Sequence, residues 1–113
     1  MTNTMRIVLA NEPRAYREVM AAAVQELRPQ HQVIAVVPDV LDDEVLRLKP
    51  ALVLCSRLTQ IVQDYPLAWI MLYPDGETRA LISIAGRSSA VGDLDFNHLL
   101  AVIDETERLS GEA

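Results

Sequence analysis

The chain contains one cysteine, so it cannot form an intramolecular disulfide, and we expect it to occupy a reducing compartment. It contains one lysine, and its arginines are scattered without forming a basic block. A formal net charge of −6 does not suit contact with a phosphate backbone, so nucleic acid is not an expected partner. No apolar run approaches the roughly 20 residues that span a bilayer, so we expect no membrane contact and a cytoplasmic location.

Glycine is scarce, at four residues, and none of the four belongs to a phosphate-binding loop motif. Neither His31 nor His98 has a Cys or His partner at metal-ligand spacing. We therefore expect both histidines at the surface, and we predict no metal site and no cofactor. No hydrolase nucleophile motif occurs and no carboxylate pair is marked out, so we predict no catalytic residue and a protein that is not an enzyme.

Apolar residues make up half of the 113 positions, which is enough for one domain over residues 1–113 with a core of its own. Continuous apolar runs predict buried strands at residues 6–10, 32–37, 51–55 and 67–73. Helical spacing of apolar residues predicts helices at residues 13–27, 38–48 and 95–109, with one or two helical turns at 58–64. Strands that alternate with helices favour a parallel sheet with right-handed crossovers.

The first of these helices carries one apolar stripe that we expect to face the sheet. Its members are Tyr16, Val19, Met20, Ala23, Val24 and Leu27. In the last helix a similar stripe includes Phe96 and Ile103, and Asp93 or Asp95 is expected to cap the amino end.

The second half of the chain predicts antiparallel strands. The turn Pro-Asp-Gly-Glu at 74–77 joins the fourth strand to a β-rich run at 78–84, and a short strand at 88–91 follows. We therefore predict an α/β three-layer sandwich. Its parallel sheet, in the order 2-1-3-4, is extended at one edge by an antiparallel meander, and helices cover both faces. Residues 110–113 are expected to form a frayed tail.

Two segments of the first half are similar to response-regulator receiver domains, and the resemblance covers residues 5–57. RIVLANEPRAYREVM, at residues 6–20, resembles the opening strand, acidic cluster and first helix of that family. LRLKPALVLCS, at residues 46–56, resembles the third strand, which in receivers leads to the aspartate that accepts a phosphoryl group. The resemblance implies a flavodoxin-like fold and a role in bacterial-type signal transduction.

The functional residues of that family are largely missing from this chain. Asn11 and Glu12 stand where receivers have two acidic residues that hold Mg²⁺, and Ser56 replaces the acceptor aspartate. Residues 72–73 lack the expected Thr or Ser, and Lys49 precedes the third strand rather than ending the fifth. The resemblance therefore implies a degenerate receiver, or pseudo-receiver, that is not phosphorylated on aspartate.

Five residues are expected to meet at the carboxyl edge of the sheet, where open parallel sheets bind ligands. They are Asn11, Glu12, Arg14, Ser56 and Arg57. One interpretation is structural: the side chains of Asn11 and Ser56 cap helices and form hydrogen bonds with the loop backbone. The other is a binding site for a small anion or a nucleotide, held by the arginines and a helix amino end.

Two residues of the central strands have a structural interpretation that competes with a functional one. Cys55 lies in an apolar strand and is expected to be buried, although a lowered pKa would make it a redox sensor. Trp69 belongs to the strongly apolar fourth strand, and we expect it to be part of the core.

The meander at 78–91 presents a sheet edge that must be covered, charged or paired. Its interface candidates are Arg79, Leu81, Ser83 and Arg87, and a second copy that pairs with this edge would give a homodimer. We therefore expect a non-enzymatic signalling or adaptor domain that acts through contact with a protein partner. The alternative is a small-molecule sensor that binds an anion or a nucleotide at the carboxyl edge.

Overall fold

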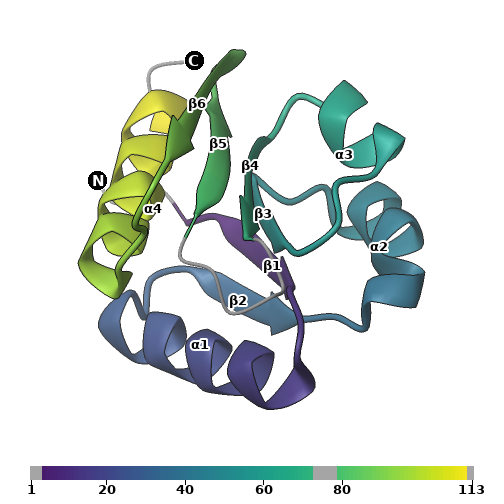
Figure 1. The fold of residues 1–113 in the computed structure, drawn as a ribbon, viewed down its shortest axis with the longest axis horizontal. Helices are drawn as coiled ribbons and strands as arrows, with labels where there is room; N and C mark the ends of the chain where they lie inside the picture. The colour runs from purple at the N-terminus through teal and green to yellow at the C-terminus, as the bar shows by residue number, and fades with distance from the viewer. Residues whose placement is uncertain (1–3, 73–78, 112–113) are drawn as a thin grey trace.

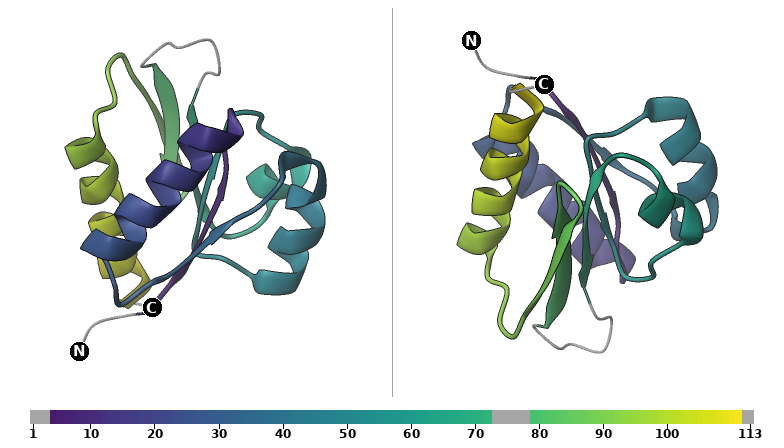
Figure 2. Two further views of the ribbon diagram at one scale, coloured as in Figure 1. Left: turned by 90° about the horizontal axis from the view of Figure 1, so that it is seen from below. Right: turned by 90° about the horizontal axis from the view of Figure 1, so that it is seen from above.

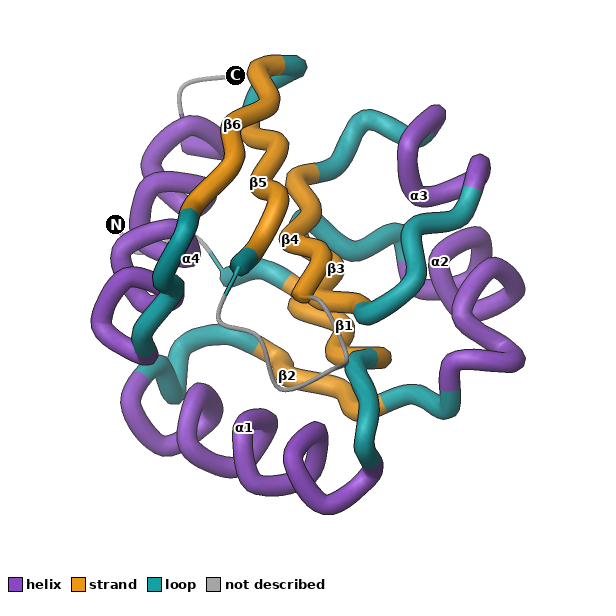
Figure 3. The backbone as a smooth tube through the Cα atoms, in the orientation of Figure 1, coloured by secondary structure: helices purple, strands orange, loops and turns teal. Residues whose placement is uncertain are grey.

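The computed structural model describes residues 4–72 and 79–111. Within these ranges six strands form one mixed sheet and four helices pack on it, so the predicted α/β class is confirmed (Figures 1 and 3). The strands are β1 (Arg6–Ala10), β2 (Gln32–Ala35), β3 (Leu52–Cys55), β4 (Ala68–Leu72), β5 (Ala80–Ile84) and β6 (Arg87–Val91). The helices are α1 (Arg14–Leu27), α2 (Leu41–Leu48), α3 (Gln60–Asp64) and α4 (Phe96–Gly111), and the 3₁₀ turn η1 (Pro38–Val40) precedes α2.

The strands lie in the order β2-β1-β3-β4-β5-β6. β1 pairs in parallel with both β2 and β3, and β3 pairs in parallel with β4. β5 and β6 then continue the sheet in antiparallel pairings. The turn predicted at 74–77 lies outside the described residues.

The two faces of the sheet support two separate apolar clusters, because successive side chains of a strand point to opposite faces. Ile7 and Leu9 of β1 join a cluster that includes residues of α1 and α4, whereas Val8 and Ala10 join a cluster with residues of α2 and α3. Figure 2 shows the same arrangement, with α1 and α4 on one side of the sheet and α2 and α3 on the other.

The apolar stripe predicted for α1 is wrong in part. Its exposed members, between 48% and 69% accessible, are Tyr16, Val19 and Leu27. The residues that α1 buries are Arg17, Met20 and Val24. The face of α1 that is buried against the sheet is therefore narrower than the apolar stripe predicted from the sequence.

Of the two predicted amino-terminal caps of α4, Asp93 and Asp95, the structure shows Asp95 capping the helix, which begins at Phe96. The carboxylate Oδ1 of Asp95 accepts the backbone N–H of His98 at 2.7 Å, which satisfies a free donor of the first turn. The helix continues to Gly111 and so includes Ser110 and Gly111, the first two residues of the predicted tail.

The prediction that His31 is a surface residue is also wrong, since the residue is only 3% exposed. Its Nδ1 accepts the backbone N–H of Met5 at 3.1 Å. Nε2 lies 2.7 Å from Oε1 of Glu107. The imidazole thus links the start of β1 to α4.

Candidate functional site

The loops that follow β1 and β3 are joined by a hydrogen bond at the carboxyl edge of the sheet. The backbone N–H of Glu12 donates to Oγ of Ser56 at 2.8 Å. β1 and β3 are parallel neighbours in register, Ala10 beside Cys55, so their carboxyl ends deliver these two residues to the same place. The serine hydroxyl, which stands at the position that the receiver resemblance gives to the acceptor, satisfies a loop donor and holds the two loops together.

The cavity beside this hydrogen bond is small, at about 60 Å³. Its lining includes Glu12, Ser56 and Arg57, completed by Ala10, Pro38, Leu41 and Thr59. Pockets that bind metabolites measure roughly 300–1,000 Å³, so this cavity does not accommodate a nucleotide. Its charged lining residues are one carboxylate, Glu12, and one guanidinium, Arg57, so the lining carries no net positive charge to attract a small anion.

The other two residues predicted for this site, Asn11 and Arg14, are not part of the lining of this cavity. Asn11 is completely buried, and neither polar atom of its side chain has a hydrogen-bond partner. Its backbone oxygen accepts a hydrogen bond from Nη1 of the buried Arg17 at 3.3 Å. Arg14 lies on the exposed surface of α1 and pairs with Glu18 at 2.9 Å. The structure therefore brings together three of the five predicted residues.

Cys55, beside this site in sequence, is enclosed in the sheet and only 1% exposed. Burial raises the pKa of its thiol to about 12, against a smaller lowering by the backbone of Arg57. A thiol is nucleophilic only as thiolate, so this environment opposes redox or nucleophilic chemistry. Over residues 4–72 and 79–111, no group of three or more His, Cys, Asp or Glu side chains has the arrangement to hold a metal ion.

The four interface candidates of the meander differ in exposure. Arg79 and Arg87 are exposed, Leu81 is half-buried against the α2–α3 cluster, and Ser83 is buried at 8%. The strand β6 itself is exposed along Arg87–Ala90 on both of its faces. Among the described strands it forms one end of the sheet.

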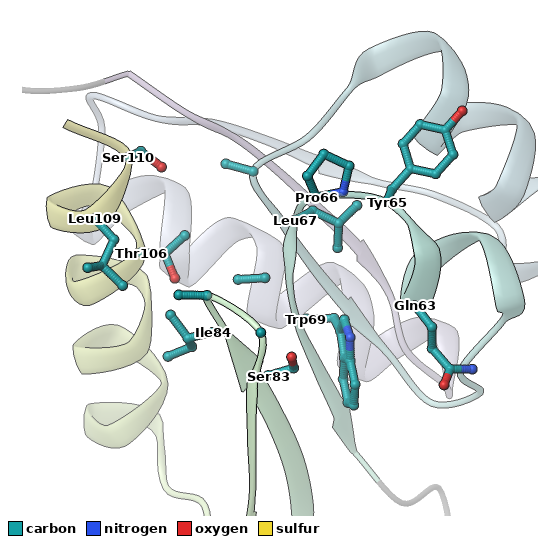
Figure 4. A pocket seen from close by; sticks show the side chains of 14 residues that line it. Gln63, Tyr65, Pro66, Leu67, Trp69, Ser83, Ile84, Thr106, Leu109 and Ser110 are labelled. Atoms are coloured by element: carbon teal, nitrogen blue, oxygen red, sulfur yellow. The ribbon is translucent and has the colours of Figure 1, made fainter. Parts of the chain in front are cut away.

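The larger concavities lie at the opposite, amino edge of the parallel strands, and the sequence reasoning did not find them. One measures about 440 Å³ and is lined mainly by residues 65–69, which lead into β4, by residues 83–86 at the end of β5 and in the turn after it, and by the last turns of α4 (Figure 4). A second, of about 670 Å³, adjoins it. Their lining residues come from distant parts of the chain, so no local motif indicated them.

Comparison of the chain with models of known protein families, with curated proteins and with solved structures finds no match. Of the helices in the described part of the chain, none has both the length and the apolar character needed to cross a bilayer.

Proposed function

We propose that this chain is a degenerate receiver-like signalling domain that has lost aspartyl phosphorylation and acts by contact with a protein partner. The proposed frame is a three-layer α/β sandwich in a cytoplasmic protein. The hydrogen bond between Ser56 and the backbone of Glu12 supports the loss of phosphoryl chemistry, because the hydroxyl has a structural role there. The small cavity beside it gives no support to a metabolite sensor at that edge.

The observation that carries this proposal is the difference between the two edge strands. At the β2 edge, Oε1 of Gln25 accepts the backbone N–H of Val33 at 3.1 Å, and Nε2 of Gln25 donates to the backbone oxygen of His31 at 2.7 Å. One side chain thus covers backbone groups that would otherwise be open to another strand. β6 is exposed over 87–90, and none of the side chains that the structure describes caps its Ser88–Ala90 backbone. As far as residues 4–72 and 79–111 are concerned, its outer edge is therefore open to pairing.

The partner that suits this edge best is a second copy of the chain. In an antiparallel pairing with a two-fold axis at Ser89, Ser88 lies opposite Ala90 of the second copy and Arg87 lies opposite Val91. Small side chains over 88–90 let the strands approach, and no like charges face each other directly. Such an isologous pairing would extend two six-stranded sheets into one.

The test of this proposal is a charge placed on the two-fold axis. Ser89→Glu puts two carboxylates opposite each other, and we expect it to raise the dimer dissociation constant by at least about fivefold. Ser89→Thr is the matched control, because it keeps a neutral strand-forming side chain and should keep the dimer. Sedimentation velocity over a concentration series measures both. A wild-type chain that stays monomeric, or a dimer that Ser89→Glu leaves intact, would refute the pairing.

A further inference from the structure

The two concavities at the amino edge share Ala51, Pro66 and Ser110 in their linings, so they form one continuous depression that we call the amino-edge cleft. The cleft opens where β4 and β5 separate. Their ladder ends at the pair Trp69–Ser83. Beyond this pair, Ala68 of β4 still pairs with β3, and Ile84 of β5 still pairs with Arg87 of β6. Ala68 and Ile84 do not pair with each other, so a gap opens in the sheet between β4 and β5.

The 440 Å³ part of the cleft is mostly apolar, its polar groups are several hydroxyls and the side-chain amide of Gln63, and none of its described lining residues is charged. Figure 4 shows Trp69, Leu67, Ile84 and Leu109 around this space. The hydroxyl of Thr106 donates to the backbone oxygen of Val102 at 2.8 Å, which leaves its oxygen able to accept a hydrogen bond. A volume of this size with an aromatic wall and few polar groups is typical of a pocket for a small organic molecule.

The 670 Å³ part of the cleft carries positive charge. Its charged lining residues are Arg6 and Lys49, and none of the described lining residues of either part is acidic, although the chain has 16 Asp and Glu residues. The guanidinium of Arg6 is held by bonds to the backbone oxygen of Leu48 at 2.8 Å and to Oε1 of Gln32 at 3.1 Å, neither of which is a carboxylate. Lys49 is exposed and ends α2 in a left-handed conformation with φ of 50°.

We propose that the amino-edge cleft binds a small amphiphilic anion, with its apolar body against Trp69 and Leu109 and its anionic head toward Arg6 and Lys49. Charge complementarity favours this class of ligand, because two cations stand beside an apolar space and none of the described lining residues is acidic. The site lies at the opposite end of the sheet from the carboxyl-edge residues. It is independent of the pairing of β6, so either proposal can fail without the other.

The chain provides its own probe, because Trp69 is its one tryptophan. Titration with decanoate below its micelle concentration should change the Trp69 emission and shift its indole N–H resonance in ¹⁵N-labelled protein, with saturation. Decanol, which has the same body without the charge, should bind less tightly. Lys49→Gln should weaken decanoate binding by roughly three- to fivefold and leave decanol binding unchanged.

The matched control is Arg47→Gln, which removes a positive charge from the same helix without touching the lining and should leave the decanoate affinity unchanged. The monomeric Ser89→Glu variant should bind decanoate as the wild type does, which separates this test from that of the dimer. Absence of a saturable change in both Trp69 signals overturns the site. Equal affinity for decanoate and decanol, or an unchanged decanoate affinity in Lys49→Gln, overturns the anionic class of ligand.

Discussion

Ser56 and Cys55 are adjacent in sequence, and both have structural roles at the carboxyl edge. The hydroxyl of Ser56 accepts a backbone hydrogen bond from the neighbouring loop, and the thiol of Cys55 fills part of the α2–α3 cluster. Of the two interpretations that the sequence left open for each residue, the structural one has direct contacts in its favour. The sequence indicated the environment of the cysteine well, because an apolar strand between two parallel neighbours is buried on both faces.

The Cys55 thiol should therefore be unreactive in the folded protein. Burial raises the pKa of this thiol to about 12, so its thiolate fraction at pH 8 is on the order of 10⁻⁴. A disulfide reagent such as Ellman's should release no colour from native protein and one equivalent after denaturation, whereas Cys55→Ala should release none in either state. A folded state with a raised thiol pKa also loses stability as the pH rises above about 8.5, where the unfolded thiol ionises. Rapid reaction of the native thiol would contradict the buried assignment.

At the scale of elements, α1 and α4 are held side by side by an ion pair as well as by the apolar cluster that they share. Arg28, at the carboxyl end of α1, donates from Nε and Nη2 to the two carboxylate oxygens of Asp104 at 2.7 and 2.8 Å. The hydrogen bond from Arg28 is the main cause that lowers the pKa of Asp104 below its usual range. The aspartate side chain is half exposed, so solvent screening keeps the contribution of this pair small.

Arg28→Gln should lower the free energy of unfolding at neutral pH by a few tenths to about 1 kcal/mol. Because the folded pKa of Asp104 is lowered, the stabilising contribution is present above the unfolded value and is lost as the pH falls through the folded value. The difference between wild type and Arg28→Gln should thus shrink below about pH 4. Urea unfolding from pH 7 to pH 3 measures it, with Arg14→Gln, which breaks a pair within one helix, as the control. A difference that persists at low pH would assign the effect to packing.

The elements themselves were largely predictable, whereas the side of a helix that is buried was not. Strong apolar runs and the breaks at Pro13, Pro38 and Pro50 located the first three strands and two helices within a few residues. For α1 the apolar periodicity included Tyr16 and Val19, which the structure leaves exposed. Periodicity indicates which residues share a face, but the width of the contact depends on the neighbouring helix and on the sheet beneath.

At the scale of the whole molecule, the sequence indicated the carboxyl edge as a meeting point and missed the amino-edge cleft. Parallel strand order alone brings Glu12 and Ser56 together, so that prediction needed no side-chain detail. The cleft depends on the register at which β4 and β5 separate. It draws its charge from Arg6 and Lys49 and its aromatic wall from Trp69, which are far apart in the chain. A pattern read along the sequence does not contain that register.

We propose that a receiver-like frame has exchanged phosphoryl chemistry for contact between proteins. Native mass spectrometry before and after incubation with acetyl phosphate and Mg²⁺ tests both halves of this claim in one measurement. We expect a dimer whose subunit mass is unchanged by the treatment. A strictly monomeric chain would contradict the contact through β6, and a gain of one phosphoryl group that Ser56→Ala abolishes would contradict the loss of the phosphoacceptor.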